Sequence, residues 1–292
     1  MPLLDALRAL TRFTPPKALP DCDPVLLADV LDAHGLAPMA SYLLETTRLG
    51  ADAPAGLRER LLAGYQGIAN DNVLKFVTLR GLLKEAGDVP VVLVDALAYV
   101  DWIYPHLAFR PAGDLRLALR GEDGERFAKA IAGGMSLLRT EHGGRVAVFG
   151  DGRLEVTVQE GLWPGGPEDA PLYARKTPVR AFGPGAHRPS REDAVLLTVG
   201  DQALEGLHAP LITYVDLREL LSGPLDAEYL RRRAAETGLA RALYGASVLV
   251  AWYWPEVADA AAAVRPALGA VERAAVEQVV EGARDPAKLR RL

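Results

Sequence analysis

The sequence predicts an α+β protein with a small mixed sheet flanked by N-terminal and C-terminal helical regions. Apolar residues recur at helical spacing through residues 1–88 and again through 189–292. Between them, in 89–188, short apolar or alternating runs are separated by glycine-containing turn pairs. The full length of 292 residues suffices for one large domain or two modest ones. We therefore expect a helical region, an α/β core and a second helical region with these boundaries.

The composition is that of an ordinary soluble protein. Half of the residues are hydrophobic and 24% are charged, and the formal net charge of −5 gives no global basic field for nucleic acid. The single cysteine, Cys22, allows no internal disulfide, which fits a reducing cytoplasm. The N-terminus lacks a signal-peptide pattern, and the longest strongly apolar run, 246–254, is too short to span a bilayer. We expect a cytoplasmic protein that binds neither nucleic acid nor membranes.

Four helices are expected in the N-terminal region. Asp23 can cap the second of them, because its carboxylate accepts from unsatisfied backbone N–H groups and Pro24 fits a first helical turn. His34-Gly35 ends that helix, since glycine suits a left-handed C-cap. The expected spans are 3–13, 24–34, 37–47 and 55–86.

The core begins with a strand, because Val91 to Val94 form the continuous apolar run typical of a strand buried on both faces. Asp95 can cap a helix over 96–103. From Asp114 to Leu119 the apolar residues alternate, which indicates a second strand. A helix over 121–133 follows, and then come strands at 136–139, 145–149 and 154–159 with turns at Gly143-Gly144 and Asp151-Gly152.

The stretch 161–189 is rich in proline and glycine, so we expect it to be irregular. Its basic side chains are Arg175, Lys176, Arg180, His187 and Arg188. A basic loop of this kind could hold phosphate groups, although such runs are more often solvated. Helices are expected after it at 190–206, 210–222, 226–237, 239–253 and 266–283.

Two short motifs and two acidic residues carry a resemblance to a known family. Arg110-Pro111-Ala112-Gly113-Asp114 opens the second strand, and His34-Gly35-Leu36-Ala37-Pro38 lies in the first helical region. Glu155 starts a later strand, and Asp216 lies among the C-terminal helices. With these residues, the chain resembles uncharacterised bacterial nucleotidyltransferase family proteins over residues 34–253. The resemblance implies the nucleotidyltransferase fold, with a nucleotidyltransferase-like sheet in the core.

Nucleotidyl transfer needs two or three carboxylates around divalent metal, which binds the triphosphate and polarises its α-phosphate. The resemblance implies that Asp114 and Glu155 are the catalytic carboxylates, and that both would bind Mg²⁺ in an active enzyme. The nucleotide-binding candidates are Asp95 and Arg110, together with Arg175, Lys176 and Arg180 of the basic loop.

Three positions depart from the family pattern. Arg116 replaces the second metal-binding aspartate, Val94-Asp95 replaces a Lys-Gly pair, and Thr157 replaces a histidine. Asp95 would repel a triphosphate, and Arg116 would put a guanidinium where the metals should lie. We therefore expect no metal or other cofactor. Because Asp114 and Arg116 share a strand face, we expect Arg116 to lie between Asp114 and Glu155 in place of the cation.

The candidates also have structural interpretations. Asp95 could be a plain helix cap, and Asp114 and Glu155 could be ion-pair partners of Arg116. The remaining histidines, His106, His142, His187 and His208, show no partner at metal-ligand spacing. Trp163, Trp252 and Trp254 are interpreted as packing residues. The chain has neither a Walker-type phosphate loop nor a dinucleotide fingerprint.

Three functions from different classes remain open. The leading hypothesis is a catalytically degenerate pseudoenzyme that binds a nucleotide or a protein partner in a regulatory role. The first alternative is an active metal-dependent nucleotidyltransferase that moves a nucleoside monophosphate onto a small molecule or protein. The second is a purely structural module for protein–protein interaction. Metal titration separates the first two, and calorimetry with nucleotides separates the third from the first.

Overall fold

The computed structural model describes residues 2–13, 18–51, 53–166 and 168–284. They fall into two compact units, each assembled from segments that are separate in the sequence. The helical unit comprises residues 1–69, 108–110 and 198–292, and the α/β unit comprises 70–107 and 111–197. The three consecutive regions expected from the sequence stay a prediction.

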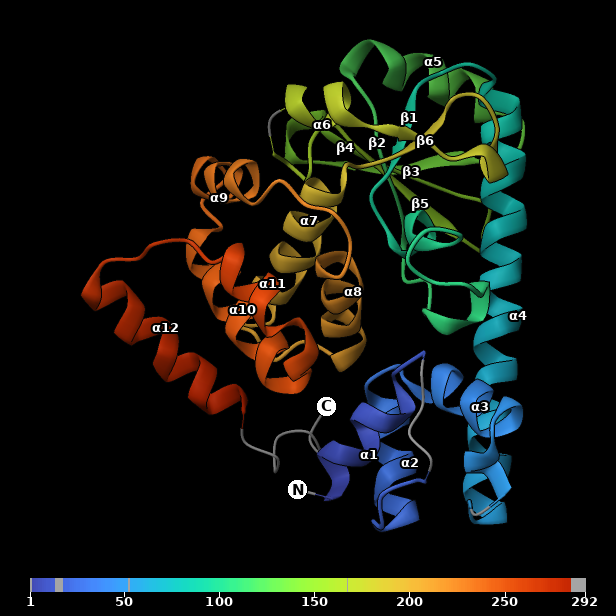
Figure 1. The fold of residues 1–292 in the computed structure, drawn as a ribbon. Coiled ribbons are helices and arrows are strands. Elements are labelled where there is room, and N and C mark those ends of the chain that lie inside the picture. Colours follow the sequence, from blue (N-terminus) through green and yellow to red (C-terminus); the bar gives the residue numbers. More distant parts are fainter. Residues whose placement is uncertain (1, 14–17, 52, 167, 285–292) are drawn as a thin grey trace. The chain divides into compact units, whose positions relative to one another are not determined.

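A mixed sheet forms the centre of the α/β unit, and the α+β prediction is confirmed (Figure 1). Its strand order is β3-β4-β5-β2-β1-β7-β6. β2 pairs in parallel with β5, and β1 pairs in parallel with β7, whereas the other pairs are antiparallel. The strands are β1 (Val91–Leu93), β2 (Leu115–Ala118), β3 (Ser136–Glu141), β4 (Val146–Gly150), β5 (Glu155–Gln159), β6 (Thr177–Pro178) and β7 (Ala186–Arg188).

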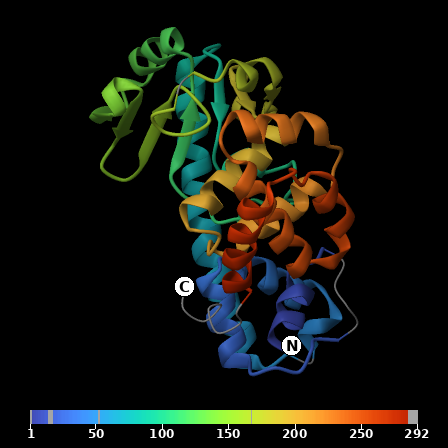
Figure 2. The ribbon, with the colours of Figure 1, turned by 90° about the vertical axis from the view of Figure 1, so that its left-hand side faces the viewer.

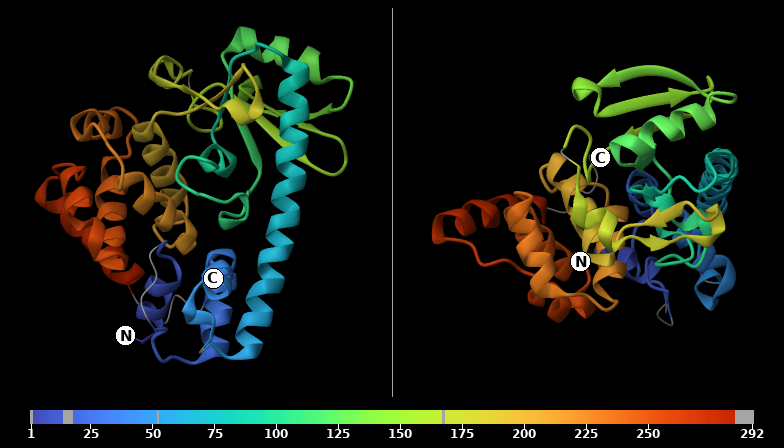
Figure 3. Two further views of the ribbon diagram at one scale, coloured as in Figure 1. Left: turned by 45° about the vertical axis from the view of Figure 1, so that its right-hand side comes forward. Right: turned by 90° about the horizontal axis from the view of Figure 1, so that it is seen from above.

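Helices cover both faces of this sheet. On one face, Val92 and Ala118 pack with Leu172 of α6 (Ala170–Arg175) and Leu197 of α7 (Arg191–Leu204). On the other face, α5 (Gly121–Ile131) lies alongside the β3–β4 hairpin (Figure 3). The buried aliphatic side chains of β1 and β2 therefore have apolar partners, which is why the sequence shows an uninterrupted apolar run at 91–94.

Two expectations for this unit need correction. The stretch 161–189 is not simply irregular, because it contains α6, β6 and β7, and β7 extends the sheet beside β1. Only glycine fits at position 185, since a Cβ there would lie 2.4 Å from the carbonyl oxygen of Val89. The expected helix at 96–103 is only a 3₁₀ turn, Ala96–Tyr99, because Val100 is extended and Asp101 has a φ of 57°.

The helical unit combines the N-terminal and C-terminal helices (Figure 2). α1 (Pro2–Leu10), α2 (Pro24–Ala33) and α3 (Ala37–Thr46) confirm three expected spans, and Asp23 caps α2 by accepting from Val25 N and Leu26 N. α4 (Ala55–Ala86) has the predicted bounds and contributes residues to both units. The C-terminal helices are α8 (Leu211–Leu221), α9 (Ala227–Glu236), α10 (Ala240–Tyr253), α11 (Ala258–Ala263) and α12 (Ala270–Ala283). The sequence did not predict α11.

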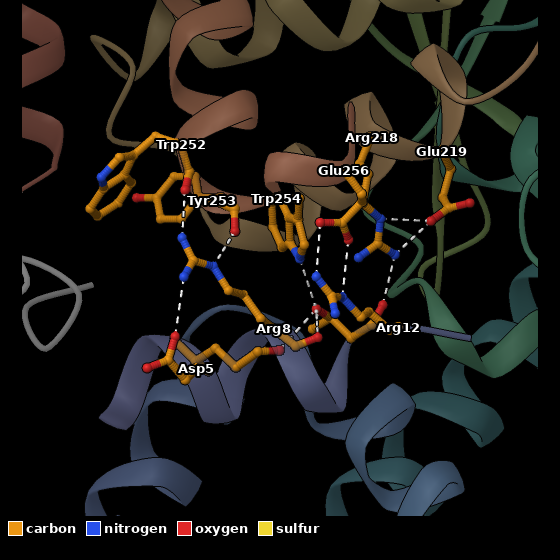
Figure 4. Close-up of polar contacts among 11 residues, drawn as sticks. Asp5, Arg8, Arg12, Arg218, Glu219, Trp252, Tyr253, Trp254 and Glu256 are labelled. Carbon is orange, nitrogen blue, oxygen red and sulfur yellow. Dashed lines mark hydrogen bonds and ion pairs between the residues drawn. The ribbon is translucent and has the colours of Figure 1, made fainter. Parts of the chain in front are cut away.

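Arginines join α1 to the C-terminal helices (Figure 4). Arg8 donates to the backbone carbonyls of Trp252 and Tyr253, and Arg12 pairs with Glu256. The buried Arg218 donates to the carbonyl of Thr11 at 2.7 Å. Backbone carbonyls at the ends of helices need such donors, so these contacts fix the N-terminal helix within the unit. Trp254 is buried and its indole N–H donates to Thr11 Oγ1, and the Trp252 ring lies edge-on to Tyr253 at 4.8 Å, so both are packing residues, as the structural interpretation predicted.

Candidate functional site

Asp95 follows the C-terminal end of β1 and holds the start of β2. Its Oδ1 accepts a hydrogen bond from Leu97 N at 2.8 Å, and its Oδ2 accepts one from Arg116 N at 2.9 Å. The residue is only 7% exposed. The helix-cap interpretation is confirmed for the 3₁₀ turn, and the second bond adds a link between neighbouring strands. Each oxygen of this buried carboxylate thus accepts from a backbone N–H group.

Asp114, Arg116 and Glu155 lie at the same end of the sheet as Asp95. Leu115 pairs with Val156 and Arg116 with Thr157, so Asp114 and Glu155 each stand one residue before a register pair. Register partners on parallel strands share a face, which places these three side chains on one face of β2 and β5. Asp114 is exposed and Arg116 is half-buried. The predicted proximity of these positions along the backbone is therefore confirmed.

The expected ion pair between Arg116 and Glu155 is wrong. Glu155 pairs instead with Arg139 of β3, whose Nη1 lies 3.0 Å from its carboxylate. Arg139 also pairs with Glu141 at 2.8 Å. Nor does Arg116 form an ion pair with Asp114 within the part of the chain that the structure describes. A guanidinium does neutralise Glu155, but it comes from the far strand of the hairpin.

Strand register explains why Arg139 takes this place. Arg139 pairs with Val148, and Val148 pairs with Thr157, so Arg139 lies on the face that carries Glu155. Sequence reasoning missed Arg139 because its pairing depends on a register shift between Leu137 and Arg139. Its one visible signal is its position as the last residue of the predicted strand 136–139.

Two residues of the family motifs hold α8 inside the helical unit. Arg110 donates from Nε to both oxygens of Asp216, at 2.9 and 3.2 Å, and the Asp216 side chain is 2% exposed. His34 Nδ1 accepts from Leu211 N, the first residue of α8, at 3.0 Å. His34 is fully buried and occupies the C-cap of α2, as the helix-end interpretation predicted. These contacts make both motifs contributors to the fold, while nucleotide binding by Arg110 stays a prediction.

The structure does not gather the basic loop around the carboxylates. Arg175 pairs with the buried Glu192 at 2.8 Å, and the half-buried Lys176 follows it. Arg180 lies toward the opposite end of the sheet, because Gly185 meets β1 at its start, Val91, whereas Asp95 follows its end. The Trp102 ring is flanked by Arg188 and Arg191, whose Cζ atoms lie 5.0 and 5.2 Å from its centroid.

The carboxylates do not fit the divalent metal centre that the fold implies. Such a centre needs converging carboxylate oxygens, yet the second acidic position is Arg116 and Glu155 already pairs with Arg139. Within residues 2–13, 18–51, 53–166 and 168–284, no group of three or more His, Cys, Asp or Glu side chains is placed to hold a metal ion. We therefore derive no catalytic step through a metal.

Comparison with known proteins gives one match. No curated protein and no solved structure matches the chain. None of the described helices is both long and apolar enough to cross a membrane.

The family model described as "uncharacterised nucleotidyltransferase" matches residues 20–255, which include both motifs and the whole sheet. The chain therefore belongs to this uncharacterised nucleotidyltransferase family.

Proposed function

We propose that this protein is a catalytically degenerate member of its family, which binds a nucleotide or a protein partner in a regulatory role and does not transfer nucleotides. The observation that carries the proposal is the double hydrogen bond of Asp95 to Leu97 N and Arg116 N. The departures from the family pattern at Arg116, Val94-Asp95 and Thr157 support the same proposal.

Backbone N–H groups that follow a strand and open a helical turn form a natural phosphate site. Here the Asp95 carboxylate already accepts from such a group, and it does so in a buried position. A triphosphate at this place would have to displace an internal anion or lie beside its charge. Either arrangement is unfavourable in a region of low dielectric.

The remaining acidic positions support the same proposal. Arg116 adds a positive charge where the family has a metal-binding aspartate, and Arg139 neutralises Glu155. A metal entering here would have to displace a guanidinium and would find at most two carboxylates. Asp114 and Glu155 both keep exposed side chains. That exposure favours the second candidate function, a working metal-dependent nucleotidyltransferase that uses Asp114 and Glu155.

Release of pyrophosphate from each of the four ribonucleoside triphosphates, with Mg²⁺ or Mn²⁺, tests the proposal. We expect no release above that of a protein-free control. The Asp114→Ala variant serves as the matched control for contaminating activity, because contamination is indifferent to this substitution. Turnover that Asp114→Ala abolishes would overturn the proposal in favour of the active enzyme. Calorimetry with the same nucleotides then separates nucleotide binding from binding of a protein partner.

A further inference from the structure

A small basic groove lies at the other end of the α/β unit's sheet. It has a volume of about 320 Å³ and lies between the C-terminal part of α4 and the segment 180–184. The two segments run side by side in Figures 1 and 3. Its charged lining residues are Arg80, Lys84 and Arg180, which we call the basic groove residues. Leu83 and Phe182, both nearly buried, supply an apolar base.

Charge in this groove is one-sided. All three basic groove residues are exposed, and none forms an ion pair within the described part of the chain. No acidic residue of the described ranges lines the groove. Many arginines elsewhere in the described ranges have a carboxylate partner, for example Arg60, Arg126 and Arg175, in a chain whose net charge is −5. What distinguishes this groove is that three cations without an ion pair line one hollow that has no acidic lining residue.

Helix electrostatics explains only part of this arrangement. A cation in the last turn of a helix is favoured by the macrodipole, which accounts for Lys84 near the end of α4. Arg80 precedes Lys84 by four residues, and like charges at this spacing destabilise a helix. Arg180 comes from a separate segment, so the sequence of α4 does not account for it. The like charges are tolerated because water screens them, and an anion would remove their repulsion.

The packing of the groove makes it a preformed feature. The ring of Phe76 of α4 packs against that of Phe182 at an interplanar angle of 44°, with centroids 4.7 Å apart, which fixes the 180–182 turn against the helix. Val91 N donates to Gly185 O at 2.8 Å, which fixes the other end of the segment on β1. Arg180 is thus presented to α4 by a segment held at both ends. A preformed site loses less conformational entropy on binding.

We propose that the basic groove binds a small ligand through a phosphate or diphosphate group. A tetrahedral oxyanion accepts several charge-assisted hydrogen bonds at once, and two guanidiniums and one ammonium provide them here. The volume suits a diphosphate or a small phosphorylated molecule, at the lower end of ordinary ligand sites. The site is separate from the Asp95 end of the sheet, so the proposal stands whether or not that end binds a nucleotide.

Titration calorimetry of the full chain with inorganic pyrophosphate, at low ionic strength, tests this proposal. The groove variant is Arg80→Gln/Lys84→Gln/Arg180→Gln. The control variant is Lys129→Gln/Arg145→Gln/Arg153→Gln, which removes the same charge from exposed positions of the same unit. We expect the dissociation constant to rise at least about tenfold in the groove variant and less than about twofold in the control, because only the first loses charge-assisted bonds. All substitutions are at exposed positions, and circular dichroism checks that both variants fold.

Three results would overturn the proposal: no binding by the wild-type protein at millimolar pyrophosphate, unchanged binding by the groove variant, or equal weakening in both variants. Equal weakening would mean that overall charge, and not the groove, attracts the anion. Adenosine diphosphate and inorganic phosphate, titrated into the same three proteins, identify the source of the group. Loss of binding in the groove variant alone supports the proposal for whichever of these anions the wild-type protein binds.

Discussion

The two ends of β1 handle charge in opposite ways. At its C-terminal end, the Asp95 carboxylate accepts from two backbone N–H groups, and nearby Glu155 pairs with Arg139. Beside its N-terminal end, the basic groove residues Arg80, Lys84 and Arg180 have no carboxylate partner within the described residues. Charges that the fold itself satisfies serve structure, whereas converging charges that it leaves unsatisfied are suited to a ligand. The end that carries Asp95, Asp114 and Glu155 is therefore the less suitable one for an anion.

The largest expected effect on stability comes from removing the Asp95 carboxylate at the C-terminal end of β1. Asp95→Ala leaves two N–H groups of a buried region without an acceptor, so we expect a loss of about 2 kcal/mol in the free energy of unfolding. Urea denaturation followed by circular dichroism measures it. Asp95→Asn is the matched control, because its single amide oxygen still accepts one bond, and its loss should be smaller. Equal stability of Asp95→Ala and the wild type would contradict the claim that the Asp95 carboxylate serves the structure.

A second prediction rebuilds the metal site. The double variant Arg116→Asp/Arg139→Gln restores a second carboxylate beside Asp114 and releases Glu155 from its partner. Because a ligand stabilises a protein by binding its folded state, Mg²⁺ at roughly five times its dissociation constant should stabilise this variant by about 1 kcal/mol. The melting temperature with and without Mg²⁺ measures the effect, and Arg139→Gln alone is the control. An equal rise in the wild-type protein would show that its own residues already hold the metal.

The pH dependence of stability tests β7, the strand next to β1. Burial lowers the pKa of His187 from its usual 6.5, and the nearby Lys176 lowers it further, so the folded state favours the neutral imidazole. The unfolded state therefore binds the proton more readily. Stability from this group is present above pH 6.5 and is lost as the pH falls from there through the lowered pKa of the folded protein. In His187→Gln, the urea midpoint should depend less on pH over this window. If the midpoint still changes with pH as in the wild type, His187 is not the cause.

The smallest effect is expected at the exposed pair. Arg139 and Glu155 have side chains that are 49% and 52% exposed, and water and salt screen such pairs. Arg139→Gln should therefore leave the urea midpoint within experimental error of the wild type. A clear loss of stability would mean that the Arg139–Glu155 pair contributes to the free energy of unfolding despite its exposure, as the Asp95 contacts are expected to do.

Much of the fold could be predicted because its signals are local. The α4 bounds, the Asp23 cap and the three strands of the β3–β5 meander follow from periodicity, capping and turn residues that lie close together in the sequence. β7 could not be predicted this way. Its three residues alternate no more than a loop does, and its conformation depends on pairing with β1 and on the close approach at Gly185.

For the site too, contacts between residues close in sequence could be predicted, and contacts that depend on tertiary pairing could not. The cap formed by Asp95 was predictable, because it joins residues two apart, whereas its bond to Arg116 N depends on sheet register. The partner of Glu155 was predicted wrongly. The family resemblance put Arg116 at a metal-binding position beside Glu155, whereas the strand register brings Arg139 to it. The groove combines Arg180 with two residues about a hundred positions earlier, and no local pattern reveals that convergence.

The exposed β3 has a consequence for behaviour at high concentration. It lies at an edge of the sheet, all of its residues are exposed, and Leu137 and Leu138 are 56% and 50% exposed. An edge strand with apolar side chains is a template on which strands of other molecules can assemble. Arg139 and Glu141 interrupt that template with charge, so they act as gatekeepers against aggregation. Replacing Arg139 can thus leave the folded state as stable as before and still make the protein more prone to self-association.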